Sequence, residues 1–269
     1  MKRIIGKIII SFILIIWIAP FFWLIATSLT KEKDIMTDNL VIFPSQPTFQ
    51  NYEKAFRKTS IGIWLLNSAI IATAATIFTI LLDTTMAFTL SRIKFRGRNA
   101  LFIFVIAGMM IPFEVLIVQL YLMFNAIGLV NNIAAMIIPR MAMPIGVFIL
   151  AQFFKGIPVA LEEAAYIDGA SRFIVYKSII IPLSKSAIAA VAIIAFIGAW
   201  NDFLWPLVIA SETAKYTVTI GIANFQGTHG TEYSLIMAGA VLASIPEIFI
   251  FLFFRKNIVK GIAMTGIKG

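Results

Sequence analysis

Ionisable side chains interrupt the most apolar stretches of this sequence, and they are the first residues whose types suggest chemistry. Five of them lie inside long, largely uncharged runs: Asp83, Glu114, Arg140, Asp202 and Glu247. A charge in hydrocarbon is costly, so such residues usually face a protein interior or a water-filled path and find partners there. Candidates for a polar path are Glu114, Arg140, Asn201 and Asp202. The alternative is that these charges serve only structural pairing or reach the ends of their helices.

Arg140 offers the sharpest of these predictions. Helical rise places Arg140, Glu114 and Asp202 at similar depths, in the outer half of a hydrocarbon core roughly 30 Å thick. Because a guanidinium stays charged, we expect Arg140 to pair with Glu114 or Asp202.

Other kinds of chemistry find little support in the sequence. The chain has no Cys and one His, His229, whereas a zinc site needs three or four converging ligands. The nearest approach to an ATP-binding Walker A loop runs from Gly261 to Gly266 and lacks the required Gly-Lys-Ser/Thr ending. No nucleophile and base motif is present. We therefore expect no catalytic residue, metal or cofactor in this chain.

The elements that position these residues are membrane-spanning helices. The 269 residues are 60% hydrophobic and 13% charged, too apolar for a soluble domain. About 20 apolar residues cross the core, and six stretches qualify: 8–30, 64–90, 100–123, 132–154, 186–208 and 233–254. The first resembles a signal peptide but is longer than the usual ~7–15 apolar residues of one. The sequence predicts an all-α integral membrane protein, with one domain over 1–269.

The distribution of Lys and Arg predicts the orientation. Most of these residues fall at the amino terminus, in the 92–98 connection, in 155–185 and in the tail 255–269. Because cytoplasmic connections collect Lys and Arg, both termini are predicted to be cytoplasmic, in the cell membrane. The segment 31–63, whose prolines oppose a continuous helix, is predicted to be an ordered external loop. The net charge of +9 therefore reflects topology and does not indicate a nucleic-acid partner.

The cytoplasmic connection 155–185 is the most informative segment. Glu162 and Glu163 suit the first turn of a helix and Ala164 and Ala165 favour one, while Gly169 permits a sharp turn into a second short helix. The small residues on this helix would allow close approach to a partner protein. An amphipathic helix lying at the membrane interface is the common alternative.

At these residues the sequence resembles the EAA loop of ABC importer permeases, in which Glu-Ala-Ala precedes a Gly, an Ile and Leu-Pro at fixed spacing. Glu163, Ala165, Gly169, Ile179 and Pro182 match that spacing, and Ile181 replaces the Leu. In the family this loop forms the coupling helix that docks on the ATPase subunit. The resemblance implies docking by Glu162, Glu163, Ala164, Ala165, Asp168, Gly169, Ala170, Ser171 and Pro182.

Further segments are similar to the carbohydrate branch of that family, the maltose and multiple-sugar type, and specifically to its second permease subunit. They comprise 43–52, 110–112, 128–131, 200–206 and the tail 259–269, so the resemblance covers nearly the whole chain. It implies a heterodimer with a second permease subunit, two copies of an ATPase subunit that bind ATP and Mg, an external solute-binding protein and a sugar substrate. Lipid surrounds the pair.

Alternatives remain open at this point. An ABC permease for a phosphorylated polyol, a peptide or an ion would share the EAA loop. An ion-coupled secondary transporter would need no ATPase and commonly shows inverted repeats. The tryptophans Trp64, Trp200 and Trp205 are of a type that stacks on sugar rings, although aromatic belts at bilayer interfaces are commoner.

Overall fold

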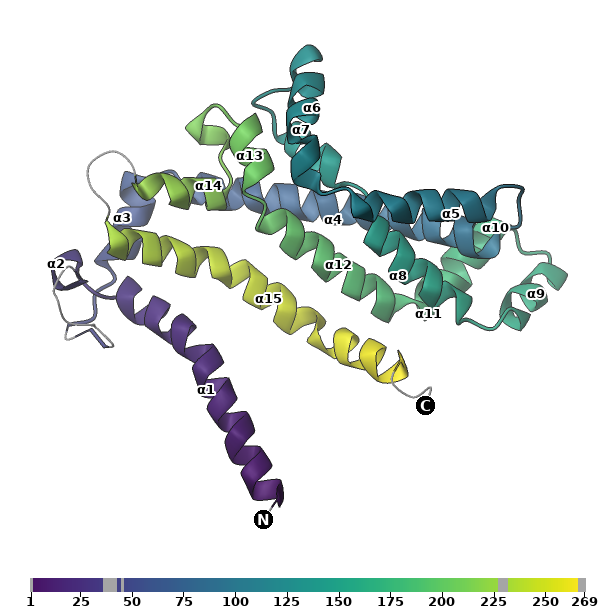
Figure 1. Ribbon diagram of the computed structural model, residues 1–269, viewed down its shortest axis with the longest axis horizontal. Helices are drawn as coiled ribbons and strands as arrows, with labels where there is room; N and C mark the ends of the chain where they lie inside the picture. The colour runs from purple at the N-terminus through teal and green to yellow at the C-terminus, as the bar shows by residue number, and fades with distance from the viewer. Residues whose placement is uncertain (1, 36–42, 45, 227–231, 266–269) are drawn as a thin grey trace. The chain divides into compact units, whose positions relative to one another are not determined.

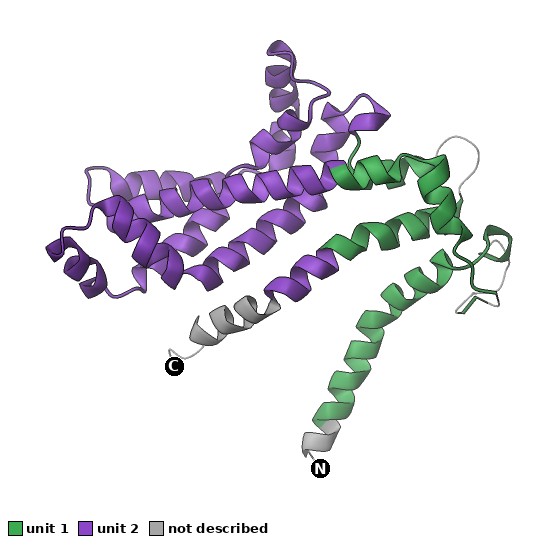
Figure 2. Cartoon of the chain, turned by 180° about the vertical axis from the view of Figure 1, so that it is seen from behind, with its two compact units in different colours: residues 1–66, 216–246 green, residues 67–215, 247–269 purple. Residues whose placement is uncertain are grey.

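The computed structural model describes residues 2–35, 43–44, 46–226 and 232–265, with the backbone alone for 2–5 and 255–265. Within these ranges every regular element is a helix and no strand occurs (Figure 1). The chain divides into two compact units, 1–66 with 216–246 and 67–215 with 247–269 (Figure 2). His229 lies outside the described residues.

The first unit combines the N-terminal helices with a segment from near the C-terminus. Its helices are α1 (Lys2–Ser28), α2 (Glu32–Ile35), α3 (Gln50–Lys58), the start of α4 (Ile61–Arg92), α14 (Val218–Ala223) and the start of α15 (Tyr233–Thr265). The Asn51 amide donates hydrogen bonds of 2.8 Å to the carbonyls of both Ser28 and Thr30. The Glu32 carboxylate accepts from the backbone N–H groups that begin α15, at 2.9 and 2.7 Å. The described part of the expected loop 31–63 contains α2, α3 and the first residues of α4, and side chains bind the backbone near its N-terminal end.

The second unit carries the residues of functional interest. Its helices are α4 over most of its length, α5 (Arg98–Ala107), α6 (Phe113–Ala126), α7 (Ile133–Ile137), α8 (Pro144–Lys155), α9 (Ala160–Ile167), α10 (Arg172–Val175), α11 (Ile181–Leu183), α12 (Lys185–Trp200) and α13 (Leu204–Ile209). A π-helical turn, Tyr176–Ile180, joins α10 to α11.

Three of the expected spans are single helices, and the count reaches six if each of three bent helix pairs is one span. The single helices, Gly6–Ser28, Ile61–Arg92 and Tyr233–Phe254, are long and apolar enough to cross a membrane alone. The bent pairs are Arg98–Met110 with Phe113–Ala126 at 97°, Ile133–Arg140 with Pro144–Lys155 at 42°, and Arg172–Leu183 with Lys185–Trp200 at 79°. The third pair covers 172–200, whereas the expected span was 186–208. The expected span 186–208 is likewise interrupted, because α12 ends at Trp200 and α13 begins at Leu204.

Prolines explain two of these breaks. Pro112 has no N–H to donate and disfavours helical backbone at the preceding Ile111, which is extended (φ −96°, ψ 111°). Pro144 acts in the same way on Met143 (φ −130°, ψ 115°). The sequence contained both signals, although it did not fix the angles.

The described part of α1 presents its apolar side chains outward. None of its most apolar 18-residue window is buried, against 33% of the corresponding window in α4. Trp17, for example, is 74% exposed. This helix therefore meets lipid or another subunit over most of its surface.

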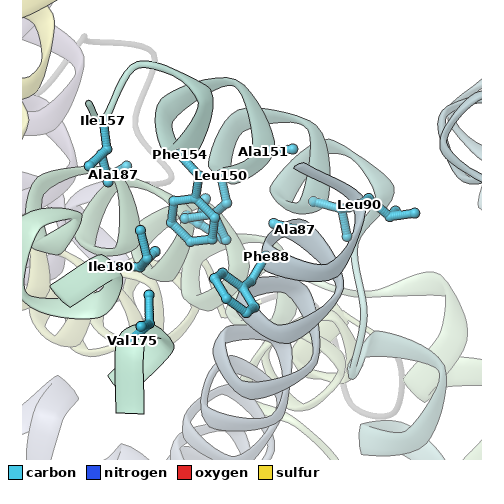
Figure 3. Close-up of a cluster of buried hydrophobic side chains, with 12 residues drawn as sticks. Ala87, Phe88, Leu90, Leu150, Ala151, Phe154, Ile157, Val175, Ile180 and Ala187 are labelled. Carbon is cyan, nitrogen blue, oxygen red and sulfur yellow. The ribbon is translucent and has the colours of Figure 1, made fainter. Parts of the chain in front are cut away.

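The apolar core of the second unit joins membrane helices to the connection 155–185 (Figure 3). Ala87, Phe88 and Leu90 come from α4, and Leu150, Ala151 and Phe154 come from α8. Val175, Ile180 and Ala187 follow from the segment after Gly169 and from the start of α12. The second half of the connection is thus packed into the same core as the spans.

Candidate functional site

Helix α9 lies in the connection 155–185 and presents most of its residues to solvent. Glu163, Ala164 and Asp168 are exposed, and so are three large apolar side chains: Leu161 at 46%, Tyr166 at 43% and Ile167 at 86%. A short polar and apolar surface of this kind, outside the spans, is suited to a protein partner.

The turn that follows α9 depends on Gly169. Its φ is +82°, a left-handed conformation that costs residues with a Cβ about 1–2 kcal/mol. Nothing lies within 4 Å of the position that a Cβ would take, so the cost comes from the backbone alone. Ser171 then accepts a hydrogen bond from the Ile174 N–H at 3.4 Å and caps α10. Ala170 packs against the core, while Pro182 is exposed in α11. The sharp turn and second short helix expected here are both present.

Glu162 lies apart from its neighbours on α9. It is 5% exposed, and its Oε1 is 2.9 Å from Nε of Arg92, the last residue of α4. Burial raises the pKa of the Glu162 carboxyl, and the positive charge of Arg92 opposes that rise. This carboxylate therefore faces the interior and is not on the exposed surface where the sequence analysis counted it.

The second cluster lies at the break between α12 and α13. Arg140 Nη2 and Nε approach Asp202 Oδ2 at 2.8 and 3.0 Å, and its guanidinium lies 4.1 Å from the centre of the Phe113 ring. Asp202, one of the two predicted partners, is thus the partner of Arg140. Glu114 is exposed in the first turn of α6, and no ion pair joins it to Arg140 in the described structure.

A neighbouring contact joins the same break to α15. The Asn201 side-chain amide donates to Glu247 Oε1. The sequence analysis named both residues but did not predict this pairing.

A cavity of about 500 Å³ opens beside Arg140. Its lining is mostly apolar and includes Gly108, Phe113, Pro139, Met143 and Gly198. Arg140 supplies the charge to this lining, so Arg140 is the one residue of the four path candidates that the structure places on the cavity wall.

Asp83 has a role that the sequence did not reveal. Its Oδ1 accepts from the Met143 N–H at 3.2 Å, at the start of α8, and Oδ2 would lie 2.1 Å from a Cβ added at Gly146. One turn earlier on α4, the Thr79 hydroxyl donates to the Arg140 carbonyl at 3.0 Å. These two side chains bind the backbone of the break on both sides and so position Arg140. The only signal in the sequence for this role of Asp83 is a glycine, Gly146, near the start of α8, where it leaves room for the carboxylate.

The three tryptophans considered for sugar stacking are all buried. Trp64, Trp200 and Trp205 are 3%, 2% and 0% exposed. Trp205 Nε1 donates to the Ala135 carbonyl at 2.9 Å and its ring packs on Phe124. These side chains consequently stabilise the fold and neither line a sugar path nor form an interfacial belt.

Comparison with known proteins decides the family. Residues 83–264 match the family described as "Binding-protein-dependent transport system inner membrane component". The chain belongs to this family. It is a multi-pass component of the inner membrane, and the family is that of the permease subunits of ABC transporters.

Curated relatives of this permease align over nearly its whole length. The trehalose/maltose transport system permease protein of Thermococcus litoralis is 36% identical, covering 99% of this chain and 96% of the relative. The arabinooligosaccharides transport system permease protein of Halalkalibacterium halodurans is 32% identical, covering 96% and 94%. A chain of a bacterial ABC transporter involved in the import of the acidic polysaccharide alginate has the same fold, with a TM-score of 0.84 over 96% of each chain at 17% identity.

Proposed function

We propose that this permease forms half of the translocation path of an ATP-driven carbohydrate importer. The observation that carries the proposal is the near-complete alignment, at 36% and 32% identity, with permeases whose names specify trehalose/maltose and arabinooligosaccharides. The substrate class is therefore an oligosaccharide. Transport assays with individual oligosaccharides would identify the substrate.

The partners follow from the same family. The permease pairs with a second permease subunit, and the pair binds two copies of an ATPase subunit, which hold ATP and Mg. An external solute-binding protein delivers the sugar. Hydrolysis belongs to the ATPase subunits, since this sequence contains no Walker A loop. Both termini and the connection 155–185 are cytoplasmic in this arrangement.

The exposed surface of α9 is the proposed docking site for the ATPase. Glu163, Ala164 and Asp168 supply polar and small contacts, and Ile167 supplies an apolar one. Gly169 sets the direction in which the chain leaves the docked helix. Closure of the ATPase pair then moves α9 and, through the core around it, the spans.

The proposed path includes the cavity beside Arg140. Asp202 fixes one side of the guanidinium, and the remaining N–H groups of Arg140 are available to hydroxyl groups of a passing sugar. Asn201 and Glu114 are further proposed path residues, although neither lines this cavity. The Arg140 guanidinium thus offers hydrogen bonds in an otherwise apolar cavity.

The test is co-purification with the partner subunits, joined to uptake of labelled maltose, trehalose and arabinotriose. Glu163→Lys reverses a charge on the docking surface and should reduce the amount of ATPase recovered with the permease. Gly169→Ala should reduce uptake because it strains the turn. Glu212→Lys makes the same reversal on an exposed residue of the external connection and should change neither measurement.

Two outcomes would contradict the proposal. Recovery of unchanged ATPase with Glu163→Lys, together with normal uptake by Gly169→Ala, would remove α9 from the docking site. Uptake that persists without any ATPase subunit would indicate an ion-coupled transporter in place of an ABC importer.

A further inference from the structure

The Arg92 side chain makes polar contacts with both α9 and the end of α8. Arg92 lies at the C-terminal end of α4, and its side chain is 8% exposed. Its Nη2 donates to the carbonyls of Phe154 and, at 2.6 Å, of Ile157. Its Nε faces Glu162 of α9 at 2.9 Å, where the Glu162 side chain is 6% exposed. One guanidinium therefore contacts three consecutive parts of the chain.

These contacts place one positive charge beside two carbonyl oxygens and a buried carboxylate. The last carbonyls of a helix have no partner within it, and Ile157, just beyond the end of α8, has its carbonyl bound by Arg92. The Phe154 carbonyl accepts from Arg92 as well as from the Ile157 N–H at 3.0 Å. A buried carboxylate such as that of Glu162 also requires a counter-charge. The planar, five-donor guanidinium serves both needs at once, which a Lys ammonium does less well.

The two halves of the connection 155–185 are attached differently. After Gly169, Val175 and Ile180 are fully buried in the apolar core and the Tyr176 hydroxyl hydrogen-bonds that of Thr84 at 2.7 Å. Before Gly169, α9 turns most of its residues outward. Ala165 packs on the core, and Glu162 makes the charged contact with α4.

We propose that Arg92 and Glu162 form a positioning pair that transmits movement of α9 to the spans α4 and α8. The proposal rests on the function proposed above, in which the ATPase moves α9. Because α4 also holds the break at Arg140 through Thr79 and Asp83, displacement of its cytoplasmic end reaches the cavity wall. The pair acts through α9 and the spans and touches neither ATP nor sugar.

The test follows the conformational change directly. The natural chain has no Cys, so Met109→Cys places a single reporter thiol on the cavity wall, where Met109 is 45% exposed. The complete complex, with both permease subunits, the ATPase and the binding protein, is treated with MgATP and vanadate. The rate of thiol labelling is then compared with and without nucleotide. We expect a nucleotide-dependent change in this complex and loss of the change when Arg92→Met is added.

Further variants separate transmission from stability. Arg92→Met alone strands a buried carboxylate and should lower the yield of complex, whereas Arg92→Met with Glu162→Leu strands no charge and should recover the yield. Both should lack the labelling response, although ATPase still co-purifies. Lys94→Met removes an exposed cation two residues away and should leave yield and response unchanged.

The outcomes distinguish this inference from the proposed function. A full labelling response in the double variant would overturn the inference alone, because apolar packing would then suffice to transmit the movement. No response in the complex that carries only the reporter would overturn the proposed function and, with it, the inference.

Discussion

The pairing of Arg140 with Asp202 predicts an asymmetry between two single variants. Arg140→Met leaves the Asp202 carboxylate, with its side chain 8% exposed, without the counter-charge that now lies 2.8 Å away. Removing one member of a buried pair costs about 3–5 kcal/mol, and we expect about 3 here since Arg140 itself is 29% exposed. Asp202→Asn leaves a guanidinium that keeps solvent and the Phe113 ring, so about 1 kcal/mol is expected.

The assay is heating of the purified complex, followed by size-exclusion measurement of the monodisperse fraction. For a chain of this size 1 kcal/mol shifts the midpoint by roughly 2–4 °C. Arg140→Met should therefore lower the midpoint by roughly 6–12 °C and Asp202→Asn by roughly 2–4 °C. Arg96→Met, at an exposed position of the connection between α4 and α5, is the matched control and should shift it little.

The double variant decides whether the pair is coupled. Arg140→Met with Asp202→Asn strands no charge and should be more stable than Arg140→Met alone. Additive shifts, or an Asp202→Asn shift as large as that of Arg140→Met, would refute this reasoning and place the partner of Arg140 elsewhere.

Three further predictions concern other parts of the chain. Gly146→Ala should lower the yield of folded permease severely, because its Cβ would lie 2.1 Å from the Asp83 carboxylate; normal yield by membrane quantification would contradict the contact. Gly221→Ala places a Cβ 1.9 Å from the Trp64 ring, and we expect a loss of about 1–3 kcal/mol, measured as a lower midpoint on heating. A Ser171→Cys thiol should react with an impermeant reagent in inverted vesicles but not in intact cells, and the reverse pattern would overturn the proposed orientation.

Much of the architecture was accessible from composition and spacing. Runs of about 20 apolar residues locate six spans because the membrane sets their length. Gly169 marks the turn after α9 because a positive φ there favours glycine, and the structure gives it φ +82°. Similar depth narrowed the partner of Arg140 to Glu114 or Asp202, because a charged Arg in a span needs a partner, and the structure shows that it is Asp202.

The rest depends on contacts that no local pattern encodes. Two adjacent acids, Glu162 and Glu163, look equivalent in sequence, yet only the first faces Arg92, because neighbouring helical residues point about 100° apart. Asp83 was recognisable only as a charge within an apolar run, and the structure shows that it binds the backbone at the start of α8. The burial of Trp205 follows from α6 and α7 packing around it, which hydropathy alone cannot predict.

The π-helical turn at Tyr176–Ile180 brings two residues of unusual spacing into the same core. Val175 and Ile180 are five residues apart, a separation that turns about 140° in an α-helix, yet both lie in one core. A π-helical turn holds more residues than an α-helical turn, so Val175 and Ile180 can face the same side despite their five-residue separation. The π-helical turn thus lets the core residues Val175 and Ile180 lie on one side while Lys177 and Ser178 between them remain exposed.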